Sequence, residues 1–230
     1  MGVVLLVRHG QASFGAEDYD VLSETGWEQA RTLGRWIAEH GPVLEAVVHG
    51  GMRRHRETWE GIAEGAGLDV VAEVDPDWAE FDHLAVLAHH TKLTGQVLDH
   101  GADRRAFQQH FEVATARWSE AGDDRADQND RADQAYPEPY ADFVTRARRA
   151  LGAAAAKPGP TVVITSGGVI AALAAQLVLP QGAALGPVWG RFNTVIANTS
   201  ITRVILGGGG ARLLTFNEHP HLQRAQITYR

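Results

Sequence analysis

The chain has 230 residues, of which 44% are hydrophobic and 21% are charged, values that fit one globular domain carrying an insertion. Its net charge of -7 excludes a protein built to coat nucleic acid, since phosphate backbones need a basic surface, but a local arginine pocket could still bind a small phosphorylated substrate. It contains no cysteine, which excludes disulfides, thiolate metal sites and cysteine nucleophiles.

The first predicted element is a strand at Val3–Val7, a continuous apolar run typical of a parallel sheet buried on both faces. No basic stretch followed by an apolar segment marks a secretory signal here, and we expect a cytoplasmic protein. The run stops at Arg8, His9 and Gly10. These residues therefore stand at the carboxyl end of the strand, where open α/β sheets bind their ligands.

A helix is predicted from about Gly26, where Thr25 and Glu28 have the spacing of a capping box. Gly41 and Pro42 end it in the usual way. Its apolar face comprises Trp27, Ala30, Leu33 and Ile37.

The same strand and helix pattern repeats once more. Val43–Val48 predicts a second strand, which ends in the glycine-containing turn 49–51, and Arg53–Glu64 predicts the helix after it. Leu68–Val74 predicts a third strand. Alternation of this kind indicates a largely parallel sheet with helices on its faces.

The region from about Glu80 to Tyr140 lacks this alternation of strands and helices. It contains a histidine-rich patch, a helix predicted over Asp103–Trp118, and the sequence Asp-Arg-Ala-Asp-Gln twice, at 124–128 and 130–134. The repeat is typical of a flexible surface loop, with an acidic docking segment as the alternative. We expect the whole region to form a lid over the strand ends.

The alternation of strands and helices returns near the carboxyl terminus. Ala141–Ala156 predicts a helix and Thr161–Thr165 a strand, and an apolar helix to about Leu179 follows. The segments Ile201–Leu206 and Arg212–Phe216 flank four glycines and predict a hairpin. The fold class is α/β, a three-layer sandwich with a mostly parallel central sheet, formed by one domain over 1–230 with a lid insertion at about 80–140.

Three loops follow an apolar strand and precede a helix, at residues 8–10, 49–54 and 166–168. A parallel sheet brings such loops to one edge, where helix N-termini favour anions. His9 is the candidate nucleophile, with its second ring nitrogen held by a backbone carbonyl of the following turn. Arg8 and Arg54 suit a phosphoryl group because guanidinium donors pair with its oxygens, and Gly10 lets the backbone come close.

These motifs, taken together and in order, resemble those of the histidine phosphatase superfamily, the phosphoglycerate mutase-like fold. The matching segments span most of the chain, at residues 4–11, 22–30, 47–58, 78–82, 161–173 and 217–222. The resemblance implies a phosphohistidine intermediate on His9 and phosphoryl binding by Arg8 and Arg54.

The resemblance also implies that Glu80 protonates the leaving oxygen and later helps to activate water. Asp82 and His83 stand beside it and could substitute. A carboxyl group near bound phosphate should have a raised pKa, since like charges disfavour ionisation.

One position departs from the family pattern. The family's fourth motif normally presents a second histidine before its paired glycines, whereas this chain has Ser166 before Gly167. Serine donates one neutral hydrogen bond, which stabilises developing charge less than a charged donor does. Either another histidine fills the gap, with His83, His219 and His221 as candidates, or the pocket binds phosphate compounds and turns them over poorly.

The sequence therefore predicts a phosphatase that hydrolyses small phosphomonoesters through His9, with Ser166 and Gly167 completing the phosphate site. The alternative is a catalytically weak or inactive phospholigand-binding protein of the same fold. We expect no cofactor, no metal, and neither nucleic acid nor a membrane as partner, and we leave a homodimer open. A mutase is disfavoured, because region 80–140 is not notably basic and the chain has only two lysines, Lys92 and Lys157.

Overall fold

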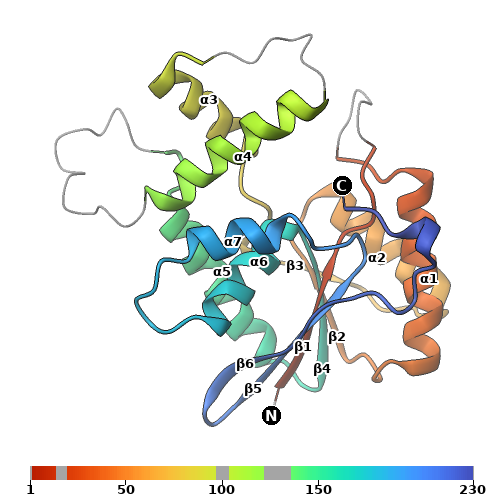
Figure 1. The fold of residues 1–230 in the computed structure, drawn as a ribbon. Coiled ribbons are helices and arrows are strands. Elements are labelled where there is room, and N and C mark those ends of the chain that lie inside the picture. Colours follow the sequence, from red (N-terminus) through yellow and green to blue (C-terminus); the bar gives the residue numbers. More distant parts are fainter. Residues whose placement is uncertain (1, 14–19, 97–103, 122–135, 230) are drawn as a thin grey trace.

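A single mixed sheet of six strands forms the centre of the computed structural model, which describes residues 2–13, 20–96, 104–121 and 136–229 (Figure 1). The strand order is β3-β2-β4-β1-β5-β6. The strands are β1 (Gly2–Arg8), β2 (Ala46–His49), β3 (Glu73–Val74), β4 (Pro160–Thr165), β5 (Ile201–Gly207) and β6 (Gly210–Glu218). The repeat at 124–134 lies outside the described residues.

The four strands β1 to β4 run parallel, and β5 and β6 form the predicted antiparallel hairpin at one side. In the β1–β4 pair Arg8 lies opposite Thr165, and in the β2–β4 pair His49 lies opposite Ile164. The loops that follow these three strands therefore leave the sheet at the same edge, as the sequence predicted.

Helices cover both faces of the sheet, which gives three layers (Figure 1). One face packs against α1 and α2, and the other against α5, α6 and α7, around two separate apolar cores. Helices α3 and α4 lie beyond the carboxyl ends of the parallel strands. The helices are α1 (Glu24–His40), α2 (Arg53–Ala66), α3 (His83–Thr94), α4 (Arg104–Glu120), α5 (Tyr140–Ala155), α6 (Gly167–Val178) and α7 (Gly186–Asn193), with short 3-10 turns at Pro76–Trp78 and Arg224–Gln226.

The largest differences from the prediction concern the start of α1, the lengths of β2 and β3, and two further helices. Helix α1 starts at Glu24, and the Ser23 side chain caps it by accepting from the amide of Gly26, so the capping box at Thr25 was wrong. Strands β2 and β3 are shorter than predicted, because Val43 and Val71 project into solvent, 83% and 91% exposed. Helices α3 and α7 were not predicted as separate elements.

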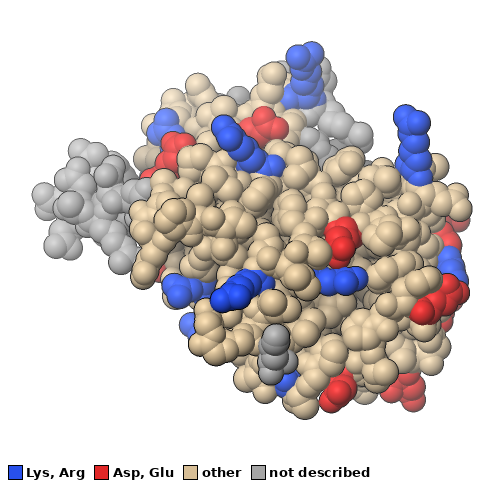
Figure 2. Space-filling model, turned by 60° about the horizontal axis from the view of Figure 1, so that its bottom comes forward, with Lys and Arg blue, Asp and Glu red and all other residues tan. Residues whose placement is uncertain are grey.

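On the face drawn in Figure 2, lysine and arginine side chains are dispersed, with uncharged residues between most of them and acidic residues interspersed. In the part of the chain that the structure describes, no helix is long and apolar enough to cross a membrane.

Candidate active site

His9 lies at the carboxyl end of β1 with 5% of its surface exposed. Its backbone amide donates to Thr165 on the neighbouring strand, 2.9 Å away. Its ring atom Nδ1 lies 2.7 Å from the carbonyl oxygen of Gly10, the backbone acceptor that the sequence predicted. Because a carbonyl only accepts, Nδ1 carries the hydrogen and Nε2 keeps a free lone pair.

The surroundings of His9 keep its ring neutral. Burial lowers its pKa well below the usual value, and the positive charges of Arg54 and Arg8 lower it further. A neutral imidazole is the form that can attack phosphorus.

Arg8 and Arg54 reach the same cavity as His9 from different elements. Arg8, the last residue of β1, donates through Nη1 to the carbonyl oxygens of Ile196 and Tyr229. Arg54 lies in the first turn of α2 and forms a 2.7 Å ion pair with Asp20. Sequence reasoning missed Asp20, because it lies in a loop with no pattern that points to Arg54.

Gly10 lets the loop after β1 lie close to α1. A Cβ atom on Gly10 would stand 2.5 Å from the carbonyl oxygen of Gly26, so no larger residue fits without moving backbone. The amide of Gly10 donates to the Thr58 hydroxyl on α2, 3.0 Å away. These contacts fix the turn that orients His9.

Glu80 lies between the 3-10 turn Pro76–Trp78 and α3. Its carboxylate accepts from the amides of Gly168 and Phe81, at 3.0 Å and 3.2 Å. Burial raises its pKa, and this outweighs the two hydrogen bonds and nearby arginines, which lower it. A Cβ atom on Gly168 would stand 2.3 Å from the carboxylate, so the second glycine of the fourth motif makes room for Glu80.

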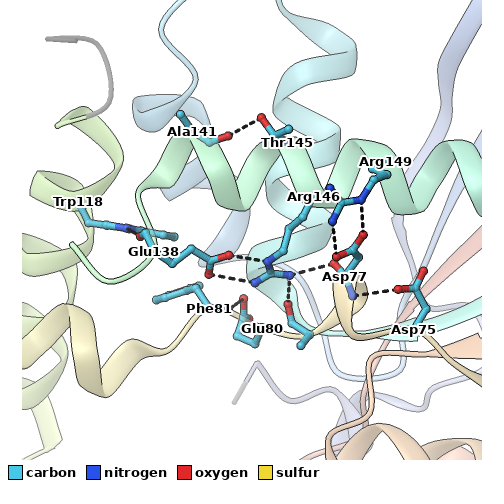
Figure 3. A network of polar contacts seen from close by, with 11 residues as sticks. Asp75, Asp77, Glu80, Phe81, Trp118, Glu138, Ala141, Thr145, Arg146 and Arg149 are labelled. Atoms are coloured by element: carbon cyan, nitrogen blue, oxygen red, sulfur yellow. Dashed lines mark hydrogen bonds and ion pairs between the residues drawn. The ribbon is translucent and has the colours of Figure 1, made fainter. Parts of the chain in front are cut away.

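An arginine on α5 holds the segment that carries Glu80 (Figure 3). Arg146 donates to the carbonyl oxygens of Asp77 and Ala79, at 2.9 Å and 2.6 Å. Its guanidinium also pairs with both carboxylate oxygens of Glu138. Arg149, one turn further along α5, pairs with the Asp77 side chain. Hydrogen bonds and ion pairs from these two arginines of α5 therefore hold the segment that carries Glu80 in place.

Asp82 and His83, the two possible substitutes for Glu80, differ in their position relative to the cavity. Asp82 is the N-cap of α3 and accepts from the amide of Ala85 at 3.0 Å. His83 lines the same cavity as His9 and Glu80, and burial lowers its pKa. Of the two residues proposed as substitutes for Glu80, only His83 therefore faces the site.

Ser166 lies at the N-cap of α6 and is buried, while Gly167 lines the cavity. The Ser166 hydroxyl oxygen lies 2.7 Å from Nε2 of His55, a residue of α2 that was not among the predicted replacements. Of the predicted replacements, His219 instead contacts the carbonyl of Asn217. His221 contacts the hydroxyl of Thr199 at 3.1 Å, and His83 remains at the cavity wall.

The cavity has a volume of about 740 Å³. Beyond Arg8, His9, Arg54 and Glu80, its wall is largely aromatic and polar, with side chains from α4 and α7. These include Phe81, Phe107, Phe111, Trp189, Gln108, Glu112, Glu120, Arg191 and Asn193. Among the residues that the structure describes, three arginines and three glutamates line it, so positive charge is not in large excess. Among the described residues, no three acidic or histidine side chains group in a way that would hold a metal ion.

Known structures share this architecture. A mycobacterial glucosyl-3-phosphoglycerate phosphatase is 24% identical, with 94% of this chain and 99% of that chain aligned and a TM-score of 0.61. A phosphoserine phosphatase mutant from Entamoeba histolytica, in complex with phosphoserine, is 18% identical, with 97% of this chain and 100% of that chain aligned and a TM-score of 0.62. Phosphoglycerate mutase from Bacillus anthracis is 17% identical, with 94% of this chain and 93% of that chain aligned and a TM-score of 0.60. At these identities the likeness shows the fold alone.

The sequence itself gives the family. No curated protein matches it. The model of the histidine phosphatase superfamily (branch 1) matches residues 4–219, which is nearly the whole chain and includes His9, Arg54, Glu80 and Ser166. The chain therefore belongs to the histidine phosphatase superfamily, branch 1, and has the phosphoglycerate mutase-like fold.

Proposed function

We propose that this protein is a phosphatase that hydrolyses small phosphomonoesters through a phosphohistidine intermediate on His9. The observation that carries the proposal is the convergence of His9, Arg8, Arg54 and Glu80 on one cavity. A nucleophile, two cations for the phosphoryl oxygens and a buried carboxyl group are the parts that such a reaction requires. Relatives of the same fold that are named phosphatases add support.

In the first step Nε2 of His9 attacks phosphorus. A P–N bond forms as the ester P–O bond breaks, and the leaving oxygen takes the proton of Glu80. Arg8 and Arg54 stabilise the charge on the transferring oxygens. The raised pKa of Glu80 suits this role, because it keeps the proton on the carboxyl group to higher pH.

In the second step the Glu80 carboxylate accepts a proton from water as the water oxygen attacks the phosphohistidine. The P–N bond breaks, inorganic phosphate leaves, and His9 returns to the neutral form with Nδ1 still bonded to the Gly10 carbonyl. Glu80 regains its proton, so the cycle is closed with one water consumed.

The composition of the cavity supports hydrolysis over a mutase reaction. A mutase must hold a second phosphoryl or carboxylate group, which calls for excess positive charge. Once Arg8 and Arg54 bind one phosphoryl group, the charged side chains left among the described wall residues are Arg191, Glu112 and Glu120, because Glu80 holds its proton for the leaving oxygen. A leaving group of low charge fits such a wall better than a second anion.

The test is the hydrolysis of 4-nitrophenyl phosphate by the wild type and by His9→Ala. We expect turnover in the wild type and loss of about three orders of magnitude or more in the variant. A quench with alkaline detergent, in which the P–N bond of a phosphohistidine survives, should trap label from a ³²P-labelled substrate on the wild-type chain and none on His9→Ala. A variant as active as the wild type would reject His9 as nucleophile.

The second candidate is a phospholigand-binding protein with little turnover, which Ser166 in place of a histidine favours. Orthovanadate binding by calorimetry separates the two functions. Micromolar vanadate binding by a wild type that hydrolyses no phosphomonoester would support the binding role. Turnover that depends on His9 would support the enzyme.

A further inference from the structure

The contact between Ser166 and His55 joins the N-cap of α6 to the first turn of α2, and the two residues are 111 positions apart in the chain. Ser166 follows β4, next to the residue whose carbonyl accepts from the His9 amide. Its hydroxyl does not cap α6, although it stands at the N-cap, and it lies 2.7 Å from Nε2 of His55 instead. Serine at an N-cap usually bonds the free amides of its own helix, and here the contact with His55 stands in place of that bond.

His55 is fully buried, with 0% exposure, and its ring centre lies 5.7 Å from that of His9. It directly follows Arg54 in α2, so one helical turn delivers both a phosphate-binding arginine and this imidazole. Burial, and then the charge of Arg54, lower the pKa of His55 well below its usual value. The ring is therefore neutral and carries a single N–H.

The hydrogen-bond pattern decides which nitrogen holds that hydrogen. Nδ1 of His55 has no hydrogen-bond partner among the described residues. A buried N–H without an acceptor is costlier than a buried lone pair without a donor, so the hydrogen belongs on Nε2. His55 then donates to the Ser166 oxygen. The hydroxyl hydrogen of Ser166 is left free to donate elsewhere.

We propose that His55 is a positioning residue that acts through Ser166, and that this pair takes the place of the second histidine of the phosphate site. His55 fixes the Ser166 rotamer, and the hydroxyl donates to an oxygen of the phosphoryl group transferred to His9. The chain N–H···O–H···O–P is polarised along its length, which strengthens the last bond beyond that of an isolated serine. This inference rests on the function proposed above.

A double-mutant cycle tests the relay, with Ser166→Ala, His55→Phe and the combined variant. Phenylalanine keeps the buried ring and removes the donor. We expect each single change to lower kcat for 4-nitrophenyl phosphate and the affinity for orthovanadate by about 10- to 100-fold. The double variant should lose no more than Ser166→Ala alone, because the two residues act as one unit. His55→Gln, which keeps an N–H donor, should recover part of the loss.

His90→Phe is the matched control, since His90 is another buried histidine but lies on α3 with its ring against His110, away from the contact of His55 with Ser166. It should leave kcat unchanged. Losses that multiply in the double variant would overturn the relay, as would a His55→Phe protein with wild-type kcat and vanadate affinity. Vanadate affinity tests the relay even without turnover, whereas a wild type without His9-dependent hydrolysis contradicts the proposed function alone. If His55→Phe does not fold, the comparison of His55→Gln with Ser166→Ala decides in the same way.

Discussion

At the level of single residues, the role of Glu80 can be compared with that of Asp82, a second carboxylate two positions further along the chain. Glu80 faces the cavity with a raised pKa, whereas Asp82 caps α3. A proton donor matters most for a basic leaving group, since a good leaving group departs without a proton. We expect Glu80→Gln to lower kcat/KM, which reports the first step, for phenyl phosphate by about 10²- to 10⁴-fold, and for 4-nitrophenyl phosphate by much less.

The pH profile gives a second measure of the same residue. As pH rises, Glu80 ionises and the proton donor is lost, and its raised pKa shifts this limb of kcat/KM above the range of an ordinary carboxyl group. As pH falls, protonation of His9 removes the nucleophile, but only at low pH because its pKa is depressed. Glu80→Gln should lose the alkaline limb and keep the acid one. If Asp82→Asn shows these losses instead, Asp82 is the donor.

At the level of elements, α5 determines where Glu80 stands. Arg146 is 16% exposed in its side chain and donates to two backbone carbonyls and Glu138. Arg149 is 67% exposed and, within the described part of the chain, pairs with Asp77 alone. Arg146→Ala leaves two carbonyls and a carboxylate without their donor, so we expect a loss of about 2 to 4 kcal/mol in the free energy of unfolding. Displacement of Glu80 should lower kcat by about 10-fold or more.

Arg149→Ala is the control on the same helix and the same segment. An exposed pair contributes little, so its stability and kcat should stay near those of the wild type. Urea unfolding and phenyl phosphate hydrolysis of the two variants, side by side, make the comparison. Equal effects would mean that the segment is held by charge in general rather than by the carbonyl contacts of Arg146.

The elements that sequence reasoning predicted are those whose signals are local. An apolar run with a glycine turn fixes the ends of β1 and β4, and these ends place His9 and Ser166. The contacts of Arg54 with Asp20 and of His55 with Ser166 join residues 34 and 111 positions apart, and no periodicity encodes them. Helix α7 escaped prediction because it has only eight residues. The lid role of region 80–140 stays a prediction, although α4 side chains do line the cavity.

At the level of the whole molecule, buried neutral histidines make stability depend on pH. His9, His55 and His221 all have pKa values lowered by burial, that of His221 to about 4. In the unfolded chain these residues take up protons near pH 6.5, whereas in the native state they do not until lower pH. Their contribution to stability is therefore complete above about pH 6.5 and is lost as pH falls toward the native pKa values. Glu80 opposes this trend, since a raised carboxyl pKa favours the native state on acidification.

His221 and His40 allow a matched test, because both rings lie against Trp36 while only His221 is buried. For His221, a fall from 6.5 to about 4 corresponds to a loss on the order of 3 kcal/mol between pH 7 and pH 4. His221→Asn should be less stable than the wild type at pH 7 and lose correspondingly less on acidification, so that the two urea midpoints converge near pH 4. His40→Asn should follow the wild-type curve throughout. Parallel curves for His221→Asn and the wild type would show that His221 stabilises by packing alone, and that the acid sensitivity arises at His9 and His55.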